Sequence, residues 1–297
     1  MISTLDKVAL EGTASLALKT GFDLGWTPDS ATYLTGKGIE GWTGSAPIRR
    51  SKSEILSGHG THAERGYKDE RLITVNGHHV AANRAAAAAF VDDLNAYLGD
   101  GTEGIFRVDD VTLGSRWVEV YLAAGGVDVT WTGGVDVGFQ VHMIAPDPRK
   151  YGAAVTTGPT GVPVPGTGLA YPLFGSPTTG ALDIGFGGQS GQVTATNRGS
   201  ADVGQVFIIT ANYAEQIVIT ETGSKRRLVY EGLVQFGQTL VLDSNQGTAA
   251  LDGIPRDGEL VVAEWVRLGR NESASWLFEA PGASAPQLTV KVTPAWW

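Results

Sequence analysis

AAVTTGPTGVPVPGTGLAYPLF, residues 153–174, decides how this 297-residue chain is divided. The stretch is rich in Gly, Pro and Thr and contains no charged residue. Pro lacks an amide donor and Gly loses much backbone entropy when it is ordered, so such a stretch cannot form a long helix or a central strand. We therefore expect a linker over 153–174 between an N-terminal domain, 1–152, and a C-terminal domain, 175–297, both of ordinary domain size.

The composition narrows the class of protein. The absence of Cys excludes disulfides, thiolate metal sites and Cys nucleophiles, and 41 glycines with only 18% charged residues favour strands joined by tight turns. The net charge is −9 and neither half is basic, so a conventional nucleic-acid-binding surface is not expected. The longest apolar run, 85–91, is too short for a membrane span or a signal peptide, and we expect a soluble protein made in the cytosol.

Strand-like alternation runs through the N-terminal half. Residues 16–26 alternate loosely, and 71–83 alternate well up to Asn76-Gly77, a dipeptide typical of hairpin turns. Further strands are expected over 104–110, 116–124, 127–133 and 135–145. In the second of these, the period of two places Val118, Val120 and Leu122 on the buried face.

One helix is expected after Asn83, which is a plausible N-cap for RAAAAAFVDDLNAYLGDG. Its apolar residues fall on one stripe at helical spacing, and Gly99 stands where a left-handed C-terminal residue is expected. The stripe consists of Ala87, Phe90, Val91, Leu94 and Leu98.

A polar stretch rich in Gly, residues 44–70, separates the first strands from the next ones. It is basic at its start and acidic at its end, and it contains too few apolar residues to form a core. We interpret it as a long hairpin or arm that projects from the domain; a disordered loop is the alternative.

The C-terminal half shows strand patterns at intervals of about 8–12 residues, without a helical stripe, which is typical of a β-sandwich. The expected fold class is therefore mainly β, with two β-sandwich-like domains, the first carrying the single Ala-rich helix. Trp265, Trp276 and Tyr230 could form a platform for stacking sugars, but their apolar neighbours favour the sandwich core. Two terminal indoles, Trp296 and Trp297, are expected to pack on the sandwich or on the other domain.

No catalytic or metal-binding pattern stands out. The histidines His59 and His62 lie in the polar stretch, and His78 and His79 are adjacent on a strand and point to opposite faces, so solvated or interface histidines are favoured over a metal site. The sequence lacks a Gly-x-Ser-x-Gly elbow and a phosphate-binding Gly loop. Carboxylates that could act in hydrolysis are Asp109, Asp110, Glu119 and Glu264, a number that any β protein offers. We expect no enzyme activity, no cofactor and no metal.

Six stretches, taken in order, carry a resemblance to a known family. They include an R-x-I-T-V-x-G strand, a DP-x-x-Y turn and a late turn similar to W-x-x-L-x-P-G. The stretches are WTGSAPIRRSKSEILSGHG (42–60), RGYKDERLITVNGHHV (65–80), FQVHMIAPDPRKYG (139–152), TATNRGSADVGQVFIITA (194–211), LVLDSNQGTAALDG (240–253) and WLFEAPG (276–282).

In these stretches the chain resembles the distal tail proteins (Dit) of long, flexible-tailed bacteriophages. It departs from the family pattern after Gly282, where ASAPQ and the strand 288–290 replace the usual N-x-I strand. The resemblance implies a structural virion protein with a galectin-like C-terminal domain. It also implies that six N-terminal domains form a ring at the distal end of the tail, between the tail tube and the tail-tip hub protein. The tape measure and DNA are then expected to pass through the ring without specific binding.

The resemblance also implies accessory or receptor-binding baseplate proteins as possible partners, and no membrane insertion. The charged arm is the expected contact between subunits. Its candidate interface residues are Arg49, Arg50, Lys52, Arg65, Tyr67 and Glu70. Two alternatives remain open: a carbohydrate- or receptor-binding tail protein that acts through the C-terminal sandwich, and an accessory domain of a hydrolase.

Overall fold

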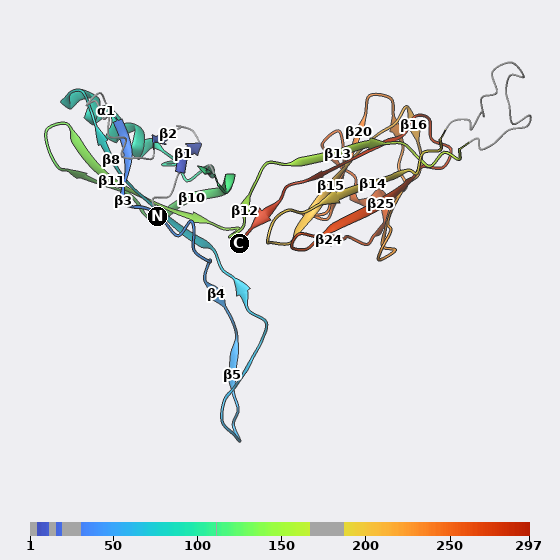
Figure 1. The fold of residues 1–297 in the computed structure, drawn as a ribbon, viewed down its shortest axis with the longest axis horizontal. Coiled ribbons are helices and arrows are strands. Elements are labelled where there is room, and N and C mark those ends of the chain that lie inside the picture. The colour runs from blue at the N-terminus through green and yellow to red at the C-terminus, as the bar shows by residue number, and fades with distance from the viewer. Residues whose placement is uncertain (1–4, 12–15, 20–30, 111, 167–186) are drawn as a thin grey trace, which may run out of the picture. The chain divides into compact units, whose positions relative to one another are not determined.

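The structure, a computed structural model, describes residues 5–11, 16–19, 31–110, 112–166 and 187–297. It divides into two compact units (Figure 1). Unit 1 comprises Met1–Ala153 together with Trp296–Trp297, and unit 2 comprises Ala154–Ala295. The described residues are mainly in β-strands and contain one α-helix, so the expected fold class is confirmed.

Unit 1 is built on one long sheet in the order β11-β8-β3-β2-β1-β9-β10-β12-β27. The 18-residue strand β10 pairs with β9 along its first half and with β11 along its second, with an irregular register between Leu122 and Val127. The two strands expected over 116–124 and 127–133 are therefore one bent strand. The strands are β1 (Leu5–Glu11), β2 (Leu16–Lys19), β3 (Ala31–Glu40), β8 (Arg71–Val80), β9 (Gly104–Asp110), β10 (Gly114–Trp131), β11 (Asp136–Ala145), β12 (Lys150–Tyr151) and β27 (Ala295–Trp296).

The bend of β10 lets the sheet enclose an apolar core. Val118 and Val120 are fully buried, as their alternation predicts. Leu122 is only partly buried and packs against the core. Side chains from both halves of the sheet, from the helix and from the bend after β3 complete the core. They include Trp42, Ile73, Val75, Phe90, Leu94, Phe106, Val108, Phe139, Val141 and Met143.

The helix α1 (Arg84–Ala96) begins as expected, because the Asn83 side chain accepts a hydrogen bond from the Ala86 amide at 2.9 Å. Ala87, Phe90 and Leu94 of the stripe are its buried residues. The prediction at its C-terminal end is wrong by one residue. Leu98 adopts the left-handed conformation with φ 48°, whereas a Cβ on Gly99 would lie 2.8 Å from the Asn95 carbonyl oxygen. Gly99 thus allows a close backbone approach.

The hairpin turn expected at Asn76-Gly77 is also wrong. β8 runs through both residues and pairs with β3 and β11 on either side. Asn76 is buried and donates to the Gly38 carbonyl at 3.2 Å. A Cβ on Gly77 would lie 2.2 Å from Cζ of Phe139, so the glycine makes room for that ring.

The linker expected over 153–174 needs correction. Its first part forms β13 (Val155–Thr160), which pairs with β26 at the edge of a sheet of unit 2. An edge strand tolerates Pro159, because one side of the strand has no hydrogen bonds to lose. Residues 167–174 lie outside the described residues.

Unit 2 is formed by two larger sheets, in the orders β13-β26-β15-β20-β21-β22 and β14-β25-β17-β18-β23, with β24 paired to β15 and a small β16–β19 pair. Phe207 and Trp276 meet edge to face in its core, with ring centroids 5.4 Å apart. The strands are β14 (Gln192–Thr196), β15 (Val203–Thr210), β16 (Tyr213–Ala214), β17 (Ile217–Glu221), β18 (Arg227–Tyr230), β19 (Val234–Gln235), β20 (Thr239–Asp243), β21 (Thr248–Leu251), β22 (Ile254–Pro255), β23 (Leu260–Ala263), β24 (Arg267–Leu268), β25 (Ser273–Glu279) and β26 (Gln287–Val292).

Trp265, Trp276 and Tyr230, which could belong either to the sandwich core or to a sugar-stacking platform, differ in how deeply they are buried. Trp276 and Tyr230 are buried, as the core interpretation predicts. Trp265 is only half-buried, so the core interpretation is wrong for this residue. It follows β23, the end strand of its sheet, whose Val261 is exposed.

Candidate functional site

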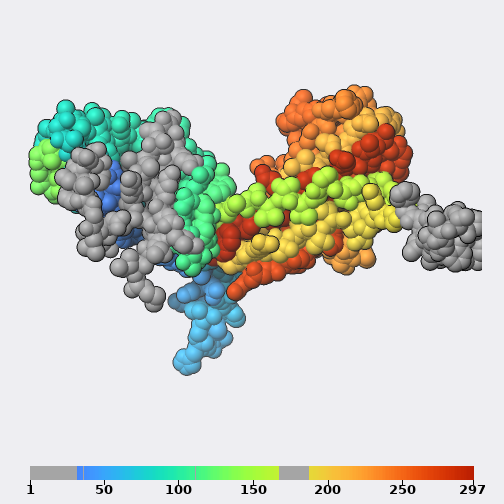
Figure 2. Space-filling view, turned by 45° about the horizontal axis from the view of Figure 1, so that its top comes forward, coloured from blue at the N-terminus to red at the C-terminus, as the bar shows by residue number. Residues whose placement is uncertain are grey.

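The arm expected over 44–70 is present as a two-stranded antiparallel hairpin in unit 1 (Figure 1). In the space-filling view this blue segment projects from the rest of the unit (Figure 2). β4 (Ile48–Arg49) pairs with β7 (Tyr67–Lys68) near its base. Further out, β5 (Lys52–Glu54) pairs with β6 (Thr61–Ala63). The alternative of a disordered loop is therefore set aside for this segment.

The arm's side chains are nearly all exposed, including large apolar ones. Leu56 near the tip is 100% exposed, and Ile48 and Tyr67 are each 60% exposed. A two-stranded hairpin without a packed face is at best marginally stable in water. The arm therefore lacks the packing that would stabilise it within a single chain.

Its charge differs in sign from the rest of the protein. Residues 44–70 carry five basic and four acidic side chains, a net charge of +1. Because the whole chain carries −9, the remaining residues carry −10. None of these nine side chains forms an ion pair with another described residue. The arm thus presents uncompensated positive charge on an acidic protein.

The structure brings some of the candidate interface residues together. Arg49 lies opposite Tyr67 in the β4–β7 pair, and the Arg65 guanidinium is 5.7 Å from the centre of the Tyr67 ring. Arg50 is exposed and lies beside Gly66. The other two stand apart from this group: Lys52 is further out in β5, and Glu70 is exposed at the base, next to β8.

A buried arginine holds the base of the arm. Arg71 is 1% exposed, and its guanidinium donates to the carbonyls of Gly41 and Gly44 at 2.7 Å and of Pro148 at 3.0 Å. These bonds connect β8 to the turn before β4 and to the turn before β12. The strands of the arm therefore project from a base that is fixed within unit 1.

Lys150 is a second buried cation at this base. Its ammonium donates to the Trp42 carbonyl at 3.0 Å and lies 5.6 Å from the centre of the Trp42 ring. Burial, with the positive charges of Arg71, Arg116 and Lys68, lowers the pKa of Lys150 from 10.5 to about 8. Both cations are held by backbone carbonyls.

The C-terminal indoles pack on unit 1, one of the two places expected for them. β27 lies beside β12 in the sheet, and the Arg116 guanidinium is 4.2 Å from the Trp296 ring. The Lys68 ammonium, from β7 of the arm, is 5.2 Å from the Trp297 ring. Cation–π contacts of this kind join the end of the chain to the base of the arm.

The DP-x-x-Y turn is built around Asp147. Its carboxylate accepts from the Arg149 guanidinium at 2.6 Å and from the Tyr151 hydroxyl at 2.6 Å. Burial acts to raise the pKa of Asp147, but these hydrogen bonds outweigh it and the pKa is lowered. The ionised carboxylate thus fixes the turn whose Pro148 carbonyl receives Arg71.

Comparison of the structure with solved proteins finds a likeness over most of the chain. The crystal structure of the Dit protein of phage SPP1, described there as a paradigm of the hub adsorption apparatus in phages that infect Gram-positive bacteria, matches with a TM-score of 0.61. The match covers 89% of this chain and 94% of SPP1 Dit at 14% identity. The chain has the Dit fold.

Two more distant matches are structures of the phage p2 baseplate in its activated conformation, one with calcium and one with strontium. Their TM-scores are 0.46 and 0.47 at 8% and 9% identity, and each covers 96% of this chain. No protein-family profile and no curated protein sequence matches this chain.

Sequence reasoning did not single out the two cations that hold the arm of this Dit fold. The signal for Arg71 was present, because it alternates with Ile73 and Val75 and therefore shares their buried face. Lys150 gave no such signal, since its strand has only two residues.

His59 and His62 are exposed on the arm, whereas His78 and His79 have structural partners. His78 lies 3.0 Å from Asp136 and His79 stacks on Phe90 with ring centroids 3.8 Å apart, so the two point to opposite faces as expected. Among the described residues, no group of three or more His, Cys, Asp or Glu side chains is arranged to hold a metal ion. Nor is any described helix long and apolar enough to cross a membrane.

Proposed function

We propose that this chain is a structural, non-enzymatic subunit of the distal tail hub of a long-tailed bacteriophage, and that six copies close a ring through unit 1. The Dit fold and the ordered sequence motifs support the assignment to a tail hub. The arm supports assembly, and it is the observation that carries the proposal.

The arm has the properties of an element that is completed by a neighbouring subunit. It projects from a fixed base, exposes Leu56, Ile48 and Tyr67, and has no packed face of its own. Each subunit would place its arm on one neighbour and receive the arm of the other neighbour on a different surface. Such an interface is heterologous, and heterologous interfaces close into rings when the rotation between subunits permits.

Charge complementarity favours a second copy of this chain as the receiver. The arm carries +1 while the remaining residues carry −10. Opposite charges on the two contacting surfaces accelerate association and fix its register. This charge distribution supports self-assembly of an acidic protein through its basic arm.

In this proposal the ring joins the tail tube to the tail-tip hub protein at the distal end of the virion, and the tape measure and DNA pass through it. Net negative charge suits such a channel, because it repels phosphates and prevents the genome from sticking. Unit 2, the galectin-like sandwich implied by the family resemblance, is displayed at the periphery, where accessory baseplate proteins dock.

The arm's cations provide the test. The double variant Arg49→Glu, Arg50→Glu reverses two exposed charges on the arm, and Arg226→Glu, Arg227→Glu reverses a matched exposed pair in unit 2. In sedimentation velocity we expect the wild type and the unit 2 variant to form the large species. The arm variant should need a roughly tenfold higher concentration, the equivalent of about 1.4 kcal/mol. Unchanged assembly both of this variant and of a protein lacking residues 48–66 would contradict the proposal.

A further inference from the structure

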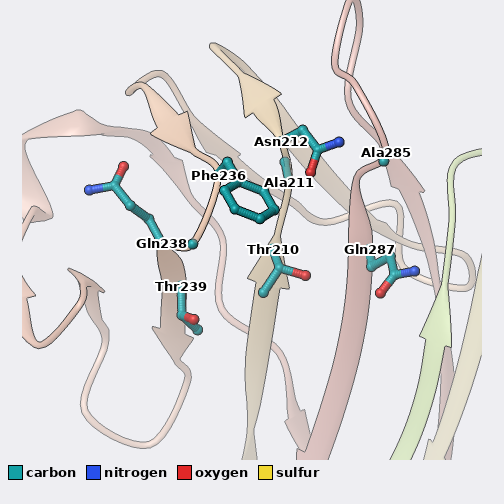
Figure 3. A pocket seen from close by; sticks show the side chains of 9 residues that line it. Thr210, Ala211, Asn212, Phe236, Gln238, Thr239, Ala285 and Gln287 are labelled. Carbon is teal, nitrogen blue, oxygen red and sulfur yellow. The ribbon is translucent and has the colours of Figure 1, made fainter.

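A hollow of about 300 Å³ lies on unit 2, where the ends of β15, β20 and β26 meet the turn after β19 (Figure 3). The register places Thr239, Thr210 and Gln287 directly opposite one another on these three neighbouring strands. Residues opposite one another in antiparallel pairs share a face, so the three side chains form one polar row.

An exposed aromatic ring flanks this row. Phe236 is 83% exposed, and Figure 3 shows its ring beside the end of β15, near Thr210. The ring belongs to a tight turn, in which the Gln238 amide donates to the Gln235 carbonyl at 3.0 Å and Gly237 has φ 82°, the combination of a type II turn. The Gln235 amide in turn donates to the Gln238 side chain at 3.0 Å. The ring is therefore carried on a fixed loop.

The hollow offers polar groups that the chain itself does not use. The side chains of Thr210, Asn212 and Gln287 form no hydrogen bond with any other described residue. None of the described residues that line the hollow is charged. Its chemistry is thus that of hydroxyl and amide groups beside one aromatic face.

We propose that this hollow is a binding site for one unit of a neutral saccharide. The C–H face of a sugar ring stacks on an aromatic ring, and its hydroxyls both donate to and accept from amides and hydroxyls. Because the described lining residues are uncharged, the hollow disfavours anionic ligands. Its volume is at the small end for ligand pockets, where a single ring fits. The aromatic residue is Phe236, not the tryptophans or Tyr230 considered from sequence.

The test uses the full chain and saturation-transfer NMR with the methyl glycosides of glucose, galactose, N-acetylglucosamine and rhamnose at millimolar concentration. Glucuronic acid serves as an anionic comparison. The variants are Phe236→Ala and Gln287→Ala, with Ile254→Ala as a matched control, because Ile254 is an exposed apolar residue outside the hollow. Circular dichroism confirms that each variant is folded.

We expect saturation transfer to at least one neutral glycoside from the wild type and the Ile254 variant, and weaker transfer to glucuronic acid. Phe236→Ala should weaken binding roughly tenfold, and Gln287→Ala should weaken it as well. The proposal is overturned if no neutral glycoside shows transfer, or if transfer survives Phe236→Ala unchanged. It is equally overturned if Phe236→Ala impairs only incorporation into tail particles, since the hollow would then be a protein docking site.

Discussion

At the scale of single residues, two buried cations determine where the arm begins. Burying a charge is costly unless hydrogen bonds compensate it, and here backbone carbonyls receive both side chains. Arg71 stays charged because its intrinsic pKa is so high, although burial lowers it. Lys150, close to Arg71, has a pKa that falls into an accessible pH range.

The pKa of Lys150 leads to a pH dependence of stability. The value is about 8 in the folded chain against 10.5 for the free side chain, so the unfolded chain binds more protons between these values. The free energy of unfolding should therefore rise with pH, by about 2 kcal/mol from about pH 7.5 to about pH 9.5, and stay constant below that interval as far as Lys150 is concerned.

Urea denaturation of the wild type, Lys150→Met and Lys291→Met across this range measures the effect. Lys150→Met should lose the rise, while Lys291→Met should keep it, because Lys291 is exposed in β26. An equal pH dependence in all three proteins would show that Lys150 is not desolvated in the folded chain.

At the scale of elements, the sequence predicts what local chemistry controls. The start of α1 follows from Asn83 and the alanines, and the arm follows from a polar segment without enough apolar residues for a core. The predictions fail where a distant contact decides. Asn76-Gly77 is a good turn locally, but Phe139 on β11 needs the space above Gly77, and no local pattern records that ring.

Gly77→Ala tests this account of β8. Its Cβ would lie 2.2 Å from Cζ of the buried Phe139 ring, so the substitution should destabilise the protein by about 1–3 kcal/mol through overpacking. Adding Phe139→Leu should restore part of the loss, measured by the midpoint of urea denaturation. Gly134→Ala is the control, because a Cβ there meets nothing within 4 Å and should leave stability nearly unchanged. A Gly77→Ala protein as stable as the wild type would refute the close contact.

The arm and its base show the same difference between features set by local sequence and features set by distant contacts. The six candidate interface residues lie on or beside the arm because sequence composition marked the whole segment. The buried side of its base was missed, since Trp42, Lys150 and Trp297 come from segments far apart in the chain. The saccharide hollow was missed for the same reason, because its polar row exists only once three strands are in register.

At the scale of the whole molecule, unit 2 is an insertion into unit 1. The chain leaves unit 1 after β12 and returns to it in β27, beside β12. The Gly/Pro-rich stretch is therefore only one of two connections, and the last two residues belong to the first unit. Sequence alone could not show this, because the returning segment is so short.

This topology predicts which fragment folds. A protein comprising residues 154–295 contains both sheets of unit 2 with β13 on the edge, and it should give one cooperative thermal transition. A protein comprising residues 175–297 lacks β13, so β26 becomes an uncovered edge, and it carries Trp296 and Trp297 without their cationic partners. We expect calorimetry to show a lower midpoint and aggregation for the second fragment; equal stability would mean that β13 contributes nothing to unit 2.

The central claim is that the arm joins copies of this chain into a closed ring, and native mass spectrometry of the full chain over a range of concentrations tests it most directly. The account predicts a species of six chains of 31.1 kDa each, without a ladder of larger open assemblies. Deletion of residues 48–66 should convert it to a folded monomer. A full chain that remains strictly monomeric at high concentration would contradict the account. So would a protein lacking residues 48–66 that still forms the same six-chain species.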